Sequence, residues 1–78
     1  MPARPPTDPT LKKFGDNVRA LRESQSLSQE QLAERADLDR TYISSVERGV
    51  RNLSLLSILR IAKALKTTAA SLCGGIGG

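Results

Sequence analysis

Apolar residues recur at spacings of three and four along most of the chain, which is the period of amphipathic helices. The first such stretch predicts a helix over about residues 10–24, with lysine, arginine, aspartate and asparagine on its polar side. Gly15 lies inside this helix, where it costs about 1 kcal/mol relative to alanine and can permit a close approach of another helix. The apolar face of the helix is formed by Leu11, Phe14, Val18 and Leu21.

A second, short helix is predicted to begin after Ser28, because Gln31 follows three residues later and completes a capping box. Leu32 and Ala33 face the core in this prediction, and the helix ends near Arg35. The next three residues, 36–38, form a turn in which Asp37 is expected to adopt a positive φ, a region that aspartate tolerates better than most residues.

A third helix is predicted from Asp39, whose carboxylate suits the N-cap position, to Gly49, which suits the left-handed position after a helix end. Ile43 and Val46 point toward the core. Together with the preceding helix and turn, residues 28–49 have the layout of a helix-turn-helix, in which the second helix enters the major groove of DNA.

Ser54 caps a predicted fourth helix, and Thr67 or Thr68 begins a last short turn of helix that extends through Leu72. The core-facing residues of the fourth helix are expected to be Leu55, Ile58, Ile61, Ala62 and Leu65. Leu56 and Leu59 are then surplus, which indicates an exposed apolar patch and hence a partner surface. Leu72 or Ile76 can extend this patch, although one of the surplus residues can instead complete the core.

The two ends of the chain differ in composition from the middle. Residues 1–9 contain all four prolines and predict a poorly ordered arm, and residues 74–78, GGIGG, predict a disordered tail. Residues 10–73 therefore form one small domain without strand signals or internal repeats. A core of this size is marginal, and oligomerisation is one way to stabilise it.

Composition narrows the class of function. The 78 residues carry a formal net charge of +4, which favours nucleic acid or a membrane surface as a partner but is equally explained by solubility. Aromatic residues are too few for a single-stranded nucleic-acid platform. There is no histidine and only one cysteine, Cys73, so neither a Cys/His zinc site nor an internal disulfide is expected.

The sequence lacks the motifs of enzymes, secreted proteins and membrane proteins. The chain contains no P-loop, dinucleotide fingerprint or clustered pair of carboxylates, so we expect neither an enzyme nor a cofactor or metal. No signal-peptide pattern and no run of roughly 20 apolar residues occurs. We therefore expect a cytoplasmic protein that makes no use of a membrane.

The outer faces of the third helix carry the candidate base-reading residues. Arginine can donate two hydrogen bonds to guanine, and serine or threonine can contact a base edge or a thymine methyl group. An ordinary solvated helix face is the alternative. The predicted base contacts are Arg40, Thr41, Ser44 and Ser45.

Other residues are placed to hold the DNA backbone. Gln29 lies at the start of the second helix, where amide groups can hold a phosphate, and Tyr42 flanks the third helix. Arg48, Arg51 and Asn52 cluster after the third helix. Lys12, Lys13 and Arg19 either add phosphate contacts or are simply solvated.

Three separated blocks, SQEQLAERA, DRTYISSVERG and SLLSILRIAKAL, resemble the Xre/Cro/phage-repressor helix-turn-helix family over about residues 11–72. DRTYIS, followed by ER and RNLS, is similar to the controller proteins of restriction–modification systems. The resemblance implies an all-α, compact five-helix bundle of the lambda-repressor-like type. It also implies the base and backbone contacts named above and a structural ion pair between Arg22 and Glu47.

The function expected from this resemblance is transcription regulation. The protein would bind a palindromic operator in double-stranded DNA as a homodimer and could regulate its own gene, with Leu56, Leu59 and Leu72 at the dimer interface. Within the same fold, an antitoxin-like or protein-interaction module whose DNA binding only autoregulates its operon is the alternative.

Overall fold

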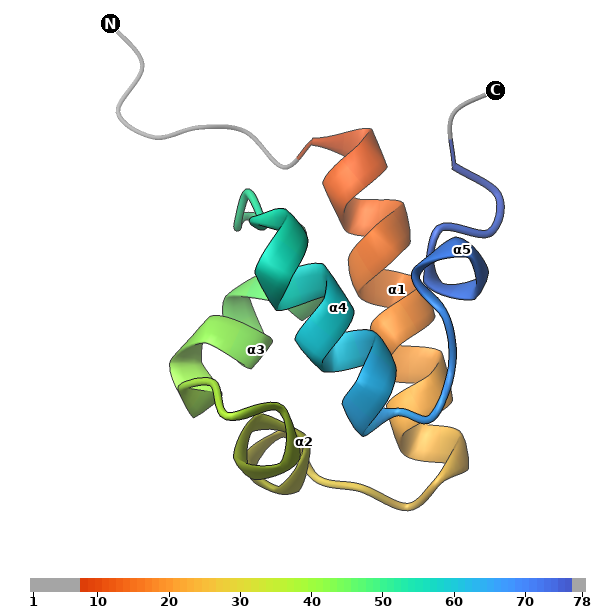
Figure 1. Ribbon diagram of the computed structural model, residues 1–78. Coiled ribbons are helices and arrows are strands. Elements are labelled where there is room, and N and C mark those ends of the chain that lie inside the picture. The colour runs from red at the N-terminus through yellow and green to blue at the C-terminus, as the bar shows by residue number, and fades with distance from the viewer. Residues whose placement is uncertain (1–7, 77–78) are drawn as a thin grey trace, which may run out of the picture.

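The structure is a computed structural model that describes residues 8–76. Within that range the chain forms five helices: α1 Pro9–Ser24, α2 Gln29–Ala36, α3 Arg40–Glu47, α4 Leu55–Ala64 and α5 Ala69–Leu72. Figure 1 shows the short α2 and α3 following one another below and beside α4, with α5 against α1. The arrangement confirms the predicted all-α five-helix fold. None of the described helices is long and apolar enough to cross a membrane.

The helix starts are set by local hydrogen bonds that the sequence predicts. Oγ of Ser28 accepts the backbone N–H of Gln31 at 3.0 Å, while Oε1 of Gln31 accepts the backbone N–H of Ser28 at 2.9 Å. Asp39 caps α3 and Ser54 caps α4 through their side chains, which accept the backbone N–H groups of Thr41 and Ser57. Thr68 caps α5, which resolves the choice between the two threonines.

The first helix begins earlier than the pattern of apolar residues predicts. Asp8 is its N-cap, with Oδ1 2.8 Å from the backbone nitrogen of Thr10, and Pro9 occupies the first helical turn, where its missing N–H costs nothing. The prediction of a poorly ordered arm is therefore wrong for residues 8 and 9. Residues 1–7 of that arm lie outside the described part of the chain.

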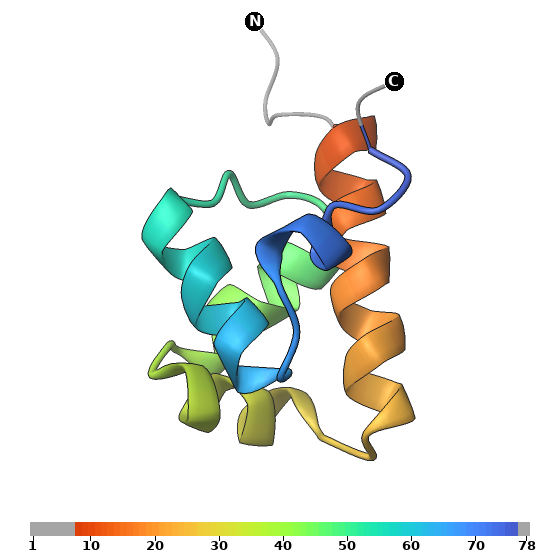
Figure 2. The same cartoon turned by 45° about the vertical axis from the view of Figure 1, so that its right-hand side comes forward.

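The core is formed by buried side chains from all five helices. Figures 1 and 2 show how these helices surround one another. A side chain at Gly15 would place its Cβ 2.3 Å from the carbonyl oxygen of Val46, so the absence of that side chain lets α1 and α3 pack closely. The most deeply buried large side chains are Val18, Leu32, Ile43, Val46, Ile61, Leu65 and Leu72.

Three predictions about the C-terminal half are corrected by the packing. Leu55 is 70% exposed, because the apolar face of α4 that meets the core begins one turn later, at Ile58. Leu72 is only 1% exposed and belongs to the core, so it cannot extend an exposed patch. Ile76 packs partly against the core, so the tail is not disordered throughout.

The C-terminal segment is also held by α1. The side-chain amide of Asn17 donates to the carbonyl oxygens of Leu72 and Gly74 at 2.8 and 2.9 Å. These two bonds place the end of α5 and the residues after it across the middle of α1.

Candidate nucleic-acid interface

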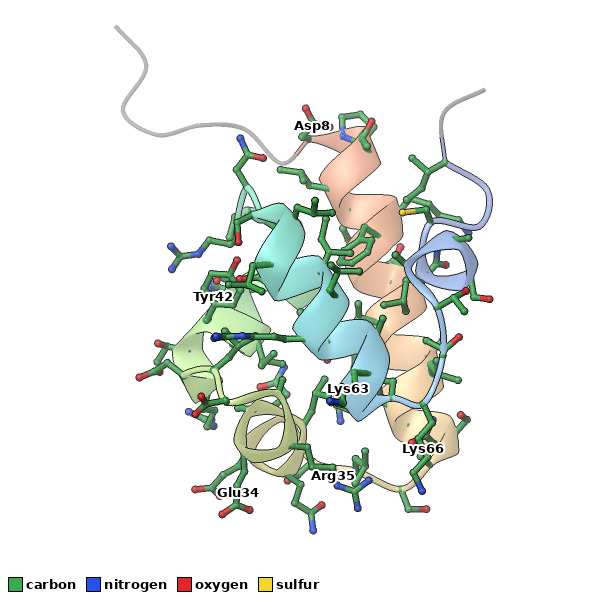
Figure 3. The ribbon with its side chains drawn as sticks, viewed as in Figure 1. Asp8, Glu34, Arg35, Tyr42, Lys63 and Lys66 are labelled. Carbon is green, nitrogen blue, oxygen red and sulfur yellow. The ribbon has the colours of Figure 1, made fainter. Side chains whose placement is uncertain are left out.

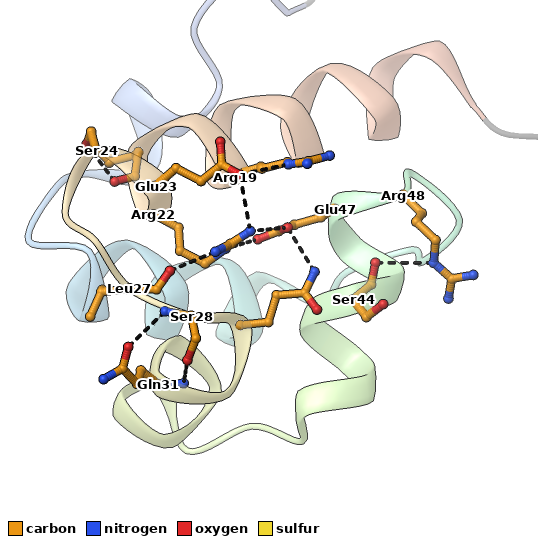
Figure 4. Close-up of polar contacts among 12 residues, drawn as sticks. Arg19, Arg22, Glu23, Ser24, Leu27, Ser28, Gln31, Ser44, Glu47 and Arg48 are labelled. Carbon is orange, nitrogen blue, oxygen red and sulfur yellow. Dashed lines mark hydrogen bonds and ion pairs between the residues drawn. The ribbon is translucent and has the colours of Figure 1, made fainter.

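The two helices of the helix-turn-helix are braced by a buried polar network. Nε and Nη2 of Arg22 donate to the two carboxylate oxygens of Glu47 at 2.7 and 3.0 Å, and Nη1 donates to the carbonyl of Leu27 at 2.7 Å. Nε2 of Gln29 donates to Oε1 of Glu47 at 3.0 Å. Glu47 thus joins α1, the start of α2 and the end of α3 (Figure 4).

Arg22 keeps its positive charge although it is buried. The hydrogen bond from Arg22 to Glu47 raises the pKa of the guanidinium above its ordinary value, against the opposing effect of burial. Two parallel charge-assisted bonds also fix the relative orientation of α1 and α3. The predicted ion pair is therefore present, and it has a structural role.

The turn between α2 and α3 is tight. Asp37 adopts φ 58° and ψ 45°, the predicted left-handed conformation, and its N–H bonds back to the end of α2. Gly49 has φ 75° directly after the C-cap of α3, as predicted for the helix end. These two positions set where the third helix begins and ends.

Arg40 and Thr41 are exposed at the N-terminus of α3, and Ser44 is half-buried one turn later. Oγ1 of Thr41 donates to Oδ1 of Asp39 at 2.6 Å, an oxygen that also accepts the backbone N–H of Thr41 at 2.8 Å. These bonds, the side-chain one first, lower the pKa of Asp39. The carboxylate therefore stays ionised at neutral pH.

Ser45 was expected among the base contacts, but its position contradicts this. The residue is 7% exposed, its Oγ donates to the carbonyl of Tyr42 at 2.8 Å, and it accepts from Nε of Arg51 at 3.2 Å. A short hydroxyl that is turned into the fold cannot reach a base edge. Ser45 instead positions Arg51.

Arg51 and Tyr42 form a second cluster beside α3. The guanidinium carbon of Arg51 lies 4.8 Å from the centre of the Tyr42 ring, within the range of a cation–π contact. Arg51 and Asn52 are exposed in the loop after α3, and Arg48 is exposed at its C-cap. Arg51 thus lies against Tyr42, whereas the side chain of Arg48 reaches back to the carbonyl of Ser44 at 3.4 Å.

Sequence reasoning missed three contacts at this site: Gln29 with Glu47, Thr41 with Asp39, and Arg51 with Tyr42. The second pair carries a sequence signal, because a threonine two residues after an N-cap aspartate lies within reach of its carboxylate. The other two join residues that only the packing of α2, α3 and the following loop brings together.

Other basic residues lie outside this cluster, on α1 and near the ends of α2 and α4. Lys12 pairs with Asp16 and Arg19 with Glu23 along the exposed side of α1. Arg35, Lys63 and Lys66 lie together at the lower end of Figure 3, near the C-terminal ends of α2 and α4, where positive charge is favourable. Tyr42 lies apart from them, on the α3 side of the same view.

Comparison with known sequences gives a clear result. A helix-turn-helix family model (HTH_3) matches residues 18–72. The control protein C.SmaI of Serratia marcescens is 53% identical over 59 residues, which cover 76% of this chain and 70% of that protein. The control protein C.BamHI of Bacillus amyloliquefaciens is 58% identical over 53 residues, covering 67% of this chain and 65% of that protein.

Solved structures agree with this result. The restriction–modification controller protein C.AhdI from Aeromonas hydrophila superposes with a TM-score of 0.78 at 50% identity, covering 80% of this chain and 94% of that one. The controller protein C.Esp1396I, solved as a tetramer with its natural 35 base-pair operator, matches with a TM-score of 0.77 at 35% identity, covering 83% and 86%. The chain belongs to this helix-turn-helix family, and its relatives by both sequence and structure include the restriction–modification controller proteins.

Proposed function

We propose that this protein is a transcriptional regulator that binds a palindromic operator in double-stranded DNA as a homodimer and controls its own gene. The observation that carries the proposal is the exposed N-terminal face of α3, which presents Arg40 and Thr41 on a helix held rigidly by Glu47. A helix in this position enters the major groove in helix-turn-helix proteins. The solved complex of C.Esp1396I with its natural operator supports the binding of operator DNA by this chain.

In this proposal the residues divide into two groups. Arg40 donates to guanine O6 and N7, and Thr41 and Ser44 contact neighbouring base edges. The backbone contacts, which fix the register of the protein on DNA, are made by Gln29, Tyr42, Arg48, Arg51 and Asn52. Gln29 can serve both DNA and Glu47, because it is only half-buried at the first residue of α2.

The dimer is proposed to form through α4. Leu56 is 58% and Leu59 is 48% exposed, and the exposed Leu55 lies beside them at the start of the helix. Three large apolar side chains on one short helix form a patch that burial against a second copy would remove from water. The third leucine of this patch is therefore Leu55 and not Leu72, which is buried.

The experiment is selection of binding sites from a library of random DNA duplexes, followed by measurement of affinity for the enriched site. We expect a site with two inverted half-sites about one helical turn apart. Arg40→Ala should weaken binding by about 1–3 kcal/mol and relax the preference at one base pair. Arg35→Ala is the matched control, because Arg35 is also an exposed arginine but lies in the last turn of α2, outside the proposed DNA contacts.

Three outcomes count against this function. If no duplex is enriched over random sequence, the protein is not a sequence-specific regulator. A selected site without inverted symmetry would refute the homodimer on a palindrome. An equal loss on all sequences would make Arg40 a phosphate contact.

A further inference from the structure

The hydroxyl group of Thr41 is already used on the surface that α3 offers to DNA. Oγ1 donates 2.6 Å to the carboxylate of Asp39, while the residue as a whole remains exposed. The same carboxylate oxygen caps the helix by accepting the N–H of Thr41 at 2.8 Å. The hydroxyl, the carboxylate and the first turn of α3 thus form one closed hydrogen-bonded unit.

A hydrogen bond from this hydroxyl to a base, formed in place of the bond to Asp39, would be unfavourable. Hydrogen bonds to an ionised carboxylate are about twice as strong as those between neutral groups, and the acceptors on base edges are neutral. The exchange would also leave the carboxylate of Asp39 with one donor fewer at the edge of a polyanion. The contact with Asp39 should therefore persist when DNA is bound.

The position of Oγ1 determines what Thr41 presents. The threonine side chain has few χ1 rotamers, and turning Oγ1 toward Asp39 directs the methyl group away from the carboxylate, because Cβ is tetrahedral. A methyl group gains by contact with apolar atoms, and the C5 methyl of thymine is the apolar group that base pairs expose in the major groove. We propose that Thr41 selects thymine by contact between the two methyl groups, and that its hydroxyl takes no part in base recognition.

This assignment rests on the proposed function and sharpens it. It places a thymine in each half-site next to the base pair contacted by Arg40, since the two residues are adjacent at the start of α3. Arg40 then supplies polar recognition of guanine, and Thr41 supplies apolar recognition of thymine.

The test replaces each thymine of the selected operator, one position at a time, by deoxyuridine, which lacks only the C5 methyl group. Burial of one methyl group corresponds to about a fourfold change in affinity per half-site, and to about fifteenfold when both half-sites are changed. We expect one symmetric thymine position at which the natural protein shows this loss.

Two variants separate the methyl group from the hydroxyl. Thr41→Ser removes the methyl and keeps the bond to Asp39, and it should bind thymine and deoxyuridine operators equally. Thr41→Val keeps a methyl and removes the hydroxyl, and it should retain the preference for thymine. Thermal unfolding followed by circular dichroism checks that Thr41→Val remains folded at the temperature of the binding assay.

The opposite pattern would overturn the inference: full affinity of Thr41→Ser and loss of discrimination in Thr41→Val would make the hydroxyl the reading group. A deoxyuridine effect that persists in Thr41→Ser would assign the thymine contact to another residue. Both results leave sequence-specific binding intact. Failure to enrich any duplex would instead refute the proposed function itself.

Discussion

Asp37 is the residue on which the geometry of the turn between α2 and α3 depends. Its φ of 58° is a conformation that costs L-residues about 1–2 kcal/mol, although aspartate tolerates it better than most. Glycine adopts this conformation without a steric penalty. The strain is therefore stored in the short connection that aligns the two helices of the DNA-binding unit.

This leads to a prediction about stability at position 37. Asp37→Gly should be at least as stable as the natural chain, whereas Asp37→Ala should be less stable than Asp37→Gly by about 1–2 kcal/mol. Urea unfolding of both variants measures the difference. Equal stability of the two variants would mean that the turn relaxes to a negative φ when the side chain allows it.

At single positions, sequence reasoning succeeds where the cause is local. Capping by Ser28 and Asp39 and the positive φ of Gly49 depend on neighbours within a few residues, and the sequence predicts them correctly. Ser45 shows the limit. It lies on the outer side of a simple helical projection, but Tyr42 and Arg51 enclose its hydroxyl, and Arg51 arrives from the loop after the helix.

Among the helices, the pairing of α1 with α3 depends most strongly on one buried contact. Arg22 and Glu47 are close to fully buried, whereas Arg19 and Glu23 form an exposed pair on the same helix α1. Removal of one partner from a buried pair leaves an uncompensated charge, which costs about 3–5 kcal/mol. An exposed pair is worth less than about 1 kcal/mol because water and salt screen it.

The two pairs provide a matched comparison. Arg22→Met should lower the free energy of unfolding by about 3–5 kcal/mol, and Arg19→Met by less than about 1 kcal/mol. Denaturant unfolding of the two variants under the same conditions tests this. Similar small losses in both would show that water reaches Glu47 once the guanidinium is removed.

The extent of each helix follows from its periodicity, but the depth at which each face is buried does not. Ile61 in α4 and Leu65 at its C-cap lie in the core as predicted, while Leu55, with the same helical spacing, is exposed. Periodicity defines a stripe on a helix without stating how far along it the neighbouring helices extend. Leu72 lies in the core although a place in the exposed patch was predicted, because Asn17 holds the end of α5 across α1. The periodicity of α5 alone does not reveal this contact.

For the whole molecule, the exposed leucines of α4 determine the proposed assembly. A chain of 8.4 kDa has a small core, and the burial of Leu56 and Leu59 in a dimer would add apolar contact that the monomer lacks. In the proposed dimer each copy reads one half-site, so occupation of the operator would depend steeply on protein concentration.

Leu56→Glu should convert the protein from a dimer to a monomer and weaken binding to the selected operator, because it places a charge at the centre of the patch. Sedimentation equilibrium should show the mass fall from two chains to one chain of 8.4 kDa. Ala20→Glu, at an exposed apolar position on α1, is the control and should remain dimeric. An unchanged mass for Leu56→Glu would exclude Leu56 from the interface.

The network around Glu47 also limits how this chain can evolve. Replacing both residues of a buried ion pair by apolar residues is often neutral for stability, although the variant that lacks only one partner is destabilised. In an isolated ion pair, two successive mutations can therefore remove the pair. Here such a replacement would also remove the partners of the Gln29 amide and the Leu27 carbonyl. Arg40 and Ser44, which are proposed to contact bases, take no part in the network, so their mutation should alter operator preference without disturbing the supporting frame.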